Sequence, residues 1–151
     1  MALRSLSVGK LEPQILKQLI FNSLGAQSSR VLLAPNIGED ATVIDFGETA
    51  LVVHSDPITG AVENVGWLAV NVCANDIATR GVRPLWILTV LLLPEEFTRA
   101  QLKNIITQID AAAKQLGVAV VGGHSEVTAG ISRPIIITTA IGEAVDKEFV
   151  R

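Results

Sequence analysis

GWLAVNVCANDIATRGVRP, residues 66–84, combines a long helical pattern with the signals that end it. Its apolar residues recur every three or four positions, which predicts a helix over residues 62–80. Gly81 suits the position just after the last turn of a helix, and Pro84 cannot continue one. The apolar run that follows, residues 85–93, is bounded by prolines and predicts a strand buried on both faces. A helix followed by such a strand is typical of a domain in which helices cover a sheet.

Asp76 is the physical anomaly of this predicted helix. It projects from the middle of an apolar stripe that consists of Val65, Leu68, Ala69 and Val72. Because an isolated buried charge costs several kcal/mol, a metal ion, an arginine or a raised pKa must compensate it. Arg80, one turn further along, offers an ion pair worth only about 0.2–0.5 kcal/mol. A functional site and a local ion pair both stay open, and the neighbouring amide of Asn75 is either a ligand contact or polar surface.

The rest of the chain predicts two further helices and four further strands. The helices are expected at residues 12–25 and 98–117, and the strands at residues 41–46, 50–54, 118–121 and 135–141. Residues 47–48 join the first two of these strands into a hairpin, and Gly122-Gly123 is expected to form a turn. Thr98 and Gln101 resemble a capping box. This order of elements predicts an α+β domain with a mixed sheet, over residues 1–145, and a linker or chain end at 146–151.

Composition indicates a cytoplasmic protein that covers part of its surface with a partner. Hydrophobic residues make up 49% of the chain and charged residues 18%, with a mean hydropathy of +0.45. This apolar excess predicts a homo-oligomer or a further domain. No apolar run reaches the roughly 20 residues of a membrane span, and a secretory leader is not recognisable. A net charge of −3 without a basic cluster argues against nucleic-acid binding. The single cysteine, Cys73, excludes an intramolecular disulfide and fits a small core residue.

Two aspartates flank the predicted hairpin. Asp40 precedes its first strand and Asp56 follows its second, so antiparallel pairing brings their carboxylates to the same end of the sheet. Taken singly, each is explained as a turn residue, because Asp favours turns. Together with Asp76, they form a set of oxygen ligands that suits a hard cation such as Mg²⁺, shared with the phosphates of a nucleotide.

A second set of candidates lies in the later part of the chain. Gly122-Gly123 permits close approach of the backbone to a phosphate or adenine, or forms a simple turn. Glu126 is a ligand, a general base or a solvated loop carboxylate. His124, beside the glycines, is the better candidate for a site histidine, whereas His54 inside a strand is expected to serve packing or the surface. P-loop, GxGxxG and GxSxG motifs are absent from the sequence.

Four blocks of this sequence, together with VGKL at residues 8–11, resemble a known enzyme superfamily. The blocks are IGEDATVI at residues 37–44, HSDPITG at 54–60, the stretch quoted above at 66–84 and VVGGHSEV at 120–127. Their order and spacing are similar to those of the aminoimidazole ribonucleotide synthetase (PurM) superfamily. That superfamily also includes selenophosphate synthetase, thiamine-monophosphate kinase, formylglycinamidine ribonucleotide synthetase and the hydrogenase maturation protein HypE. The chain looks most like the HypE-like, AIR synthase related members.

The resemblance implies a PurM-like N-terminal domain with a mixed sheet of four-stranded type packed on helices. It also implies a homodimer in which two sheets pair into a β-barrel, with ATP in a groove near the dimer interface. The ATP-binding residues implied by motif match are Lys10, Asp40, Asp56, Asn75, Asp76, Gly122 and Gly123. The three aspartates are also the implied Mg²⁺ ligands, and Glu126 and His124 are the implied catalytic residues.

The chemistry implied by the resemblance is ATP-dependent phosphorylation of an amide-type oxygen, on a small-molecule or protein-thiol-borne substrate. Thiamine-monophosphate kinase-like phosphoryl transfer and a non-catalytic dimerisation or regulatory module are the alternatives. His124 stands where several relatives have an aspartate. Enzymes of this superfamily carry a second domain of comparable length that helps to build the substrate site, so these 151 residues are expected to represent part of an ATP-dependent synthetase or dehydratase.

Overall fold

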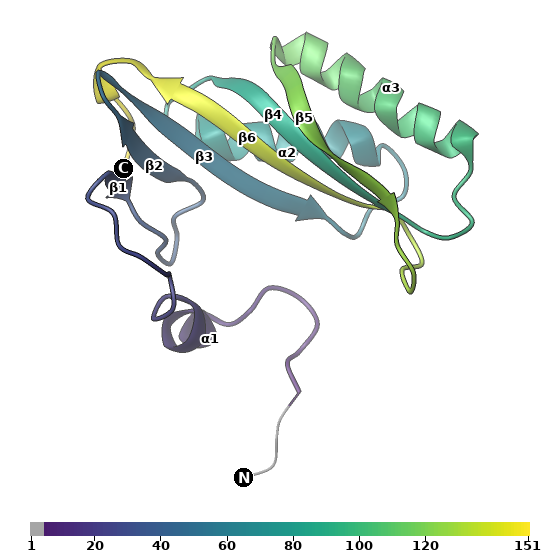
Figure 1. The fold of residues 1–151 in the computed structure, drawn as a ribbon, viewed down its shortest axis with the longest axis horizontal. Helices are drawn as coiled ribbons and strands as arrows, with labels where there is room; N and C mark the ends of the chain where they lie inside the picture. Colours follow the sequence, from purple (N-terminus) through teal and green to yellow (C-terminus); the bar gives the residue numbers. More distant parts are fainter. Residues whose placement is uncertain (1–4) are drawn as a thin grey trace.

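The computed structural model describes residues 5–151 and shows a six-stranded sheet packed on helices (Figure 1). The elements are, in chain order, α1 (Pro13–Ile15), the π-helical η1 (Leu16–Ile20), β1 (Val31–Leu33), β2 (Thr42–Phe46), β3 (Thr49–Ile58), α2 (Val65–Ala78), β4 (Pro84–Leu93), α3 (Arg99–Leu116), β5 (Ala119–Val127), β6 (Ile135–Ala144) and the 3-10 turn η2 (Val145–Lys147). Within residues 5–151, no helix is both long and apolar enough to cross a bilayer.

The sheet has the strand order β1-β2-β3-β6-β4-β5. β4 and β5 are parallel, and all other neighbours are antiparallel. The predicted α+β class with a mixed sheet is therefore confirmed. The sheet contains the five strands predicted from the sequence and, at one edge, the three-residue β1, so it is larger than the four-stranded type that the resemblance implies. β1 is too short to give a recognisable sequence pattern.

Alternating burial along the central strands defines the two faces of the sheet. In β6, every second residue from Ile136 to Ala144 is buried, and Val52 of β3 and Ile87 of β4 are wholly buried as well. These side chains face the helices, where Val70 and Ile77 of α2 are also wholly buried. The opposite face, which we call the open face, includes two large side chains of β4 that are partly exposed: Trp86 and Leu88.

α2 and α3 pack closely because of Gly66. A Cβ atom at this position would lie 2.5 Å from the backbone oxygen of Ile105, so only glycine fits the contact. The Gly66 N–H also donates to Gln108 Oε1 at 3.0 Å. α2 also packs against β3 and β6, so its contact with α3 helps to fix its position over these two strands.

The predicted boundaries of α3 are confirmed. The Gln101 N–H donates to Thr98 Oγ1 at 3.2 Å, and the Thr98 N–H donates to Gln101 Oε1 at 2.8 Å, which completes a capping box. Gly117 ends the helix in the left-handed conformation, with a φ of 68°.

The first predicted helix, residues 12–25, is too long. α1 continues as η1 only to Ile20, and neither segment has a buried residue. Leu19, which the pattern places on an apolar face, is 64% exposed. Without a surface to pack against, there is little to extend a helix of this length.

The turn predicted at Gly122-Gly123 is also wrong. Both glycines lie inside β5, which continues to Val127, well past the predicted end at residue 121. The backbone of Gly123 lies so close to β4 that a Cβ atom there would be 1.8 Å from the Thr89 oxygen. The glycines therefore serve strand pairing.

Residues 146–151 pack against the domain, although the sequence gives no packing signal there. Phe149 contacts the core, and the Val150 N–H donates to the Arg80 oxygen at 2.8 Å. The last residues of the chain are thereby tied to the end of α2.

Candidate functional site

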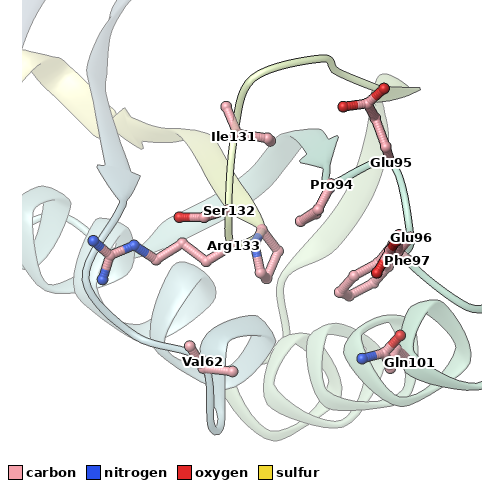
Figure 2. A pocket seen from close by; sticks show the side chains of 10 residues that line it. Val62, Pro94, Glu95, Glu96, Phe97, Gln101, Ile131, Ser132 and Arg133 are labelled. Carbon is pink, nitrogen blue, oxygen red and sulfur yellow. The ribbon is translucent and has the colours of Figure 1, made fainter.

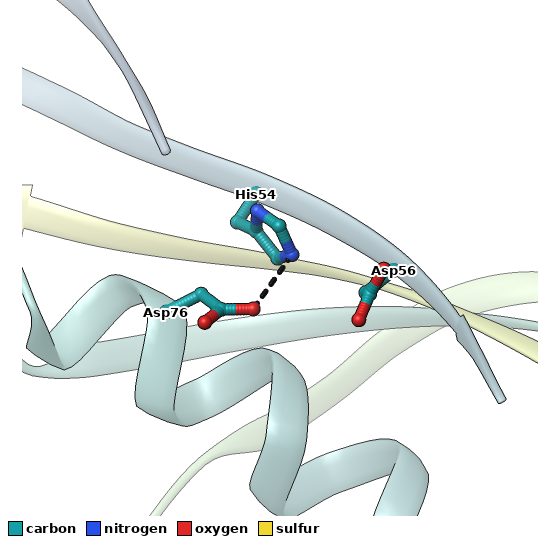
Figure 3. Close-up of side chains that lie close together, drawn as sticks. All are labelled: His54, Asp56 and Asp76. Carbon is teal, nitrogen blue, oxygen red and sulfur yellow. Dashed lines mark ion pairs between the residues drawn. The ribbon is translucent and has the colours of Figure 1, made fainter. Parts of the chain in front are cut away.

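His54, Asp56 and Asp76 come together between β3 and α2 (Figure 3). One nitrogen or oxygen atom from each lies within 4.8 Å of the others. His54 Nε2 is 2.8 Å from Asp76 Oδ2, with side chains that are 14% and 24% exposed. We call these three residues the His54 cluster.

The strand period and the helix contact explain why these residues meet. His54 and Asp56 are two residues apart in β3, so both side chains point to the face that α2 covers. Asp76 follows buried Cys73 by three positions on α2. The Cys73 thiol donates to the Thr138 oxygen of β6 at 3.1 Å, which fixes this part of the helix over the sheet.

Asp56 lies inside β3 rather than after it. The pairing between β3 and β6 continues beyond the predicted end at residue 54 to Ile58, with Asp56 opposite Thr138. The side chain of Asp56 is therefore presented by a paired strand, which restricts its position more than a loop does.

The His54 ring is oriented by Asp40. Its Nδ1 contacts the backbone oxygen of Asp40, which lies just before β2. Asp40 therefore lies near the end of the hairpin, as predicted, but it contacts His54 through its backbone oxygen. The residue itself is exposed.

The charges around Asp76 make its ionised form costly. Partial burial is the largest cause that raises the pKa of the Asp76 carboxyl. His54 opposes this shift, and the negative charges of Asp40 and Asp56 add to it. Lys10 also lies close enough to lower the pKa slightly. All three predicted aspartates and Lys10 therefore belong to one electrostatic neighbourhood.

Burial also determines the pKa of Cys73, which lies near the cluster on α2. Desolvation raises the pKa of its thiol to about 11, and the charges of Asp76 and Asp56 contribute. The thiol is only 1% exposed, as expected for a core cysteine.

The local ion pair considered between Asp76 and Arg80 is wrong. Arg80 pairs instead with Glu39, and its side chain is 7% exposed. The side chain next to Asp76 is instead that of His54, on a different element. Its position could have been inferred from the spacing of His54 and Asp56, because alternate residues of a strand share a face.

The prediction that His124 is the site histidine is not supported, because His124 and Glu126 lie on the open face. Gly123 pairs with buried Thr89, whereas His124 pairs with Val90, which points the other way. His124 Nε2 is 3.0 Å from Glu126 Oε2, and this hydrogen bond lowers the pKa of Glu126. These two residues form a separate exposed pair, away from the His54 cluster.

The other predicted nucleotide contacts are distributed differently. Asn75 is exposed next to Asp76 on α2. Gly122 has room above it, since a Cβ atom there would meet only Leu88 Cδ2 at 3.7 Å. Neither Gly122 nor Gly123 belongs to the His54 cluster, because both lie in β5 at the edge of the sheet.

A pocket of about 630 Å³ (Figure 2) is lined by none of the three residues of the His54 cluster. It is formed where β4 ends, α3 begins and the chain enters β6. Phe97, Gln101 and Arg133 line it, and of these three only Gln101 has a sequence signal, as part of the capping box of α3. Its acidic residues, Glu95 and Glu96, do not converge with the cluster on β3 and α2.

Residues 38–144 match the family described as AIR synthase related protein, N-terminal domain. A Methanocaldococcus jannaschii protein named for hydrogenase expression/formation is 30% identical over 139 residues. That alignment covers 89% of this chain and 42% of that protein. The chain spans less than half the length of the curated relatives that it matches.

Solved structures share this fold. A crystal structure of a HypE–HypF complex has a TM-score of 0.69 at 26% identity, covering 86% of this chain and 42% of that one. A ThiL structure in complex with AMPPCP and TMP has a TM-score of 0.73 at 22% identity, covering 95% and 46%, and supports the fold alone. The fold implied by the sequence resemblance is thereby confirmed.

Proposed function

This chain belongs to the family of AIR synthase related proteins, in their N-terminal domain, and on that premise we propose that it binds ATP with Mg²⁺ at the His54 cluster. The activity of the whole protein is then the ATP-dependent phosphorylation of an amide-type oxygen. A second domain is expected to help build the substrate site, since the chain spans less than half of its relatives.

The convergence of carboxylates on partly buried positions supports this proposal most directly. Asp56 and Asp76 lie within 4.8 Å, and burial together with the charges of Asp40 and Asp56 raises the pKa of Asp76. A divalent cation relieves both the repulsion and the desolvation. Carboxylate oxygens are the ligands that Mg²⁺ takes in proteins, usually one or two of them together with substrate phosphates. The carboxylates of Asp56 and Asp76 therefore fit this ion.

The chain's own residues act by holding charge in place. Asp56 and Asp76 bind the cation, which neutralises the phosphates for in-line transfer. Lys10, whose charge lowers the pKa of Asp76, is the residue that we propose contacts a phosphate oxygen. Cys73 and Thr138 keep α2 in register with the sheet through their hydrogen bond, so the ligands stay oriented. Little covalent chemistry by the protein is needed for this reaction class.

Glu126 and His124 remain candidates for proton transfer under one condition. They lie on the open face, so a second chain must bring them to a nucleotide. We propose that two copies pair through this face into a β-barrel, which its exposed Trp86 and Leu88 favour. Each copy then contributes residues next to the other copy's site.

Calorimetric titration of ATP into the 151-residue chain tests the proposed function. We expect binding with Mg²⁺ and none after chelation with EDTA. Asp56→Asn and Asp76→Asn should each weaken binding at least about tenfold, the effect of roughly 1.4 kcal/mol. Asp110→Asn is the matched control, because Asp110 is exposed on α3 and pairs with Lys114. Equal affinity of the two site variants and wild type would refute the assignment.

Phosphoryl transfer to a thiamine-monophosphate-like acceptor is a second candidate. The likeness to the thiamine monophosphate kinase of Aquifex aeolicus, at 25% identity and a TM-score of 0.63, favours it. Measuring ADP release with each acceptor separates the two activities. Release with thiamine monophosphate (TMP) favours the kinase activity, and release with a carbamoylated thiol favours phosphorylation of an amide-type oxygen. A non-catalytic module of the same fold predicts no nucleotide binding at all.

A further inference from the structure

The hydrogen bond to Asp40 determines which nitrogen of His54 carries its proton. A backbone carbonyl oxygen only accepts hydrogen bonds, so Nδ1, which contacts the Asp40 oxygen, must be the donor. In a neutral imidazole this leaves Nε2 as the nitrogen with the free lone pair.

The Nε2 atom of His54 faces carboxylates but makes no hydrogen bond with them. It is buried, lies 2.8 Å from Asp76 Oδ2, and makes no hydrogen bond among the described residues. Figure 3 shows the ring between Asp56 and Asp76, with Nε2 facing the gap. A lone pair and a carboxylate oxygen repel at this distance, so a positive centre is required there.

A second buried donor next to this gap also lacks a partner. Thr138 is wholly buried, and its Oγ1 makes no hydrogen bond within residues 5–151. It lies opposite Asp56 in the β3–β6 pair, on the same face of the sheet. Buried polar groups are normally satisfied, and a water on a bound ion is a suitable partner for this hydroxyl.

We propose that His54 Nε2 is a direct ligand of the divalent cation, together with Asp56 and Asp76. A metal-bound histidine usually donates its other ring N–H to a carboxylate or a backbone carbonyl, as His54 does to Asp40. The inference rests on the proposed function, because the same ion is the one that would hold the nucleotide. Binding of the ion to the protein does not itself require the nucleotide.

This donor set favours a transition-metal ion. Mg²⁺ prefers oxygen ligands in a near-ideal octahedron, whereas imidazole suits first-row transition metals. One nitrogen and two carboxylates therefore select Mn²⁺ over Mg²⁺. Direct ligation also makes His54 a determinant of ion choice rather than a packing residue.

Pulsed electron paramagnetic resonance of bound Mn²⁺ tests this directly. Untagged 151-residue protein is loaded with Mn²⁺ without nucleotide, and electron spin echo modulation detects ¹⁴N coupled to the ion. The chain has two histidines, His54 and His124. We expect a nitrogen coupling in wild type, its loss in His54→Gln and its retention in His124→Gln.

Calorimetry of the same proteins gives a second measurement. Wild type should bind Mn²⁺ at least about tenfold more tightly than Mg²⁺, because Mg²⁺ prefers oxygen ligands and an imidazole nitrogen suits a transition-metal ion better. His54→Gln should lose most of that preference while its Mg²⁺ affinity changes little.

Either of two spectroscopic results would overturn the inference. Bound Mn²⁺ without nitrogen coupling, or a coupling that persists in His54→Gln, contradicts it, because an imidazolium paired with Asp76 gives no such signal. Failure of the proposed function looks different: Mn²⁺ binds with nitrogen coupling, but ATP does not bind with either ion.

Discussion

His54 Nε2 on β3 lies 2.8 Å from Asp76 Oδ2 on α2, and this contact joins the sheet to the helix at the point where the acidic residues gather. The two residues are 22 positions apart, with a strand end and a loop between them. Their meeting depends on the packing of α2, which Gly66 and Cys73 determine. The packing of the hydrophobic core therefore brings the residues of the site together.

Replacing Asp76 should stabilise the metal-free domain. The raised pKa means that the ionised carboxylate is disfavoured by the fold, mainly through burial. The destabilisation of the folded domain by this charge is absent below pH 3.8, the pKa of the unfolded chain, and is complete above the raised pKa of the folded state. At pH 8, Asp76→Asn should therefore melt about 2–4 °C higher than wild type, as expected for about 1 kcal/mol in a domain of this size. The difference should shrink as the pH is lowered toward 4, and thermal scans across pH that lack this trend would contradict the account.

Gly123→Ala should destabilise the domain strongly. The added Cβ would lie 1.8 Å from the Thr89 oxygen, and the φ of 150° is unfavourable for other residues. β4 and β5 must separate, at a cost of about 3 kcal/mol or more. Gly122→Ala is the matched control, since its Cβ would meet only a side-chain atom at 3.7 Å. Urea unfolding should separate the two variants, and equal midpoints would disprove the close strand contact.

Cys73 should be unreactive in the folded protein. With a pKa of about 11 and a buried sulfur, its thiolate fraction at pH 8 is roughly 100-fold below that of a thiol of ordinary pKa. Labelling with a disulfide reagent should be slow in buffer and rapid in urea. Because the folded pKa is raised from 9.0, the thiol's contribution to stability is complete below pH 9 and is lost as the pH rises to about 11. Cys73→Ala should remove that alkaline loss, and rapid labelling without urea would argue against the packing of α2.

Trp86→Lys should prevent dimer formation. Trp86 belongs to the open face, and it is 37% exposed in the single chain. A charge there is costly to bury between two sheets. Sedimentation equilibrium should give about twice the 16.0 kDa chain mass for wild type and the chain mass for the variant. Trp67→Lys, at an exposed tryptophan of α2, should remain dimeric. A wild-type monomer at high concentration would disprove pairing through this face.

The helices that carry the fold could be predicted because their signals are local. Gly81, Gly117 and the Thr98–Gln101 capping box mark helix ends directly in the sequence. Asp76 was identified for the same reason, since a carboxylate beside an apolar helical stripe is visible from spacing alone. The short first helix was overpredicted because its pattern does not reveal that no partner surface is present.

The partners of the site residues could not be predicted, because they depend on register. Proximity to the glycines suggested His124 as the site histidine, but the β4–β5 pairing shifts between Ile87 and Leu88. A shift of one residue moves a side chain to the other face of a sheet, and here it places His124 on the open face, in a strand that β6 and β4 separate from β3. His54 was passed over because a histidine in a strand gives no sign of what the neighbouring helix presents to it.

Crystals of this chain grown with Mn²⁺ and the ATP analogue AMPPCP test the central claim most directly, through the anomalous scattering of manganese. We expect one strong anomalous peak within bonding distance of Asp56, Asp76 and His54 Nε2, with phosphate oxygens of the analogue completing the coordination of the ion. A nucleotide bound elsewhere, with no manganese peak between these three side chains, would contradict it.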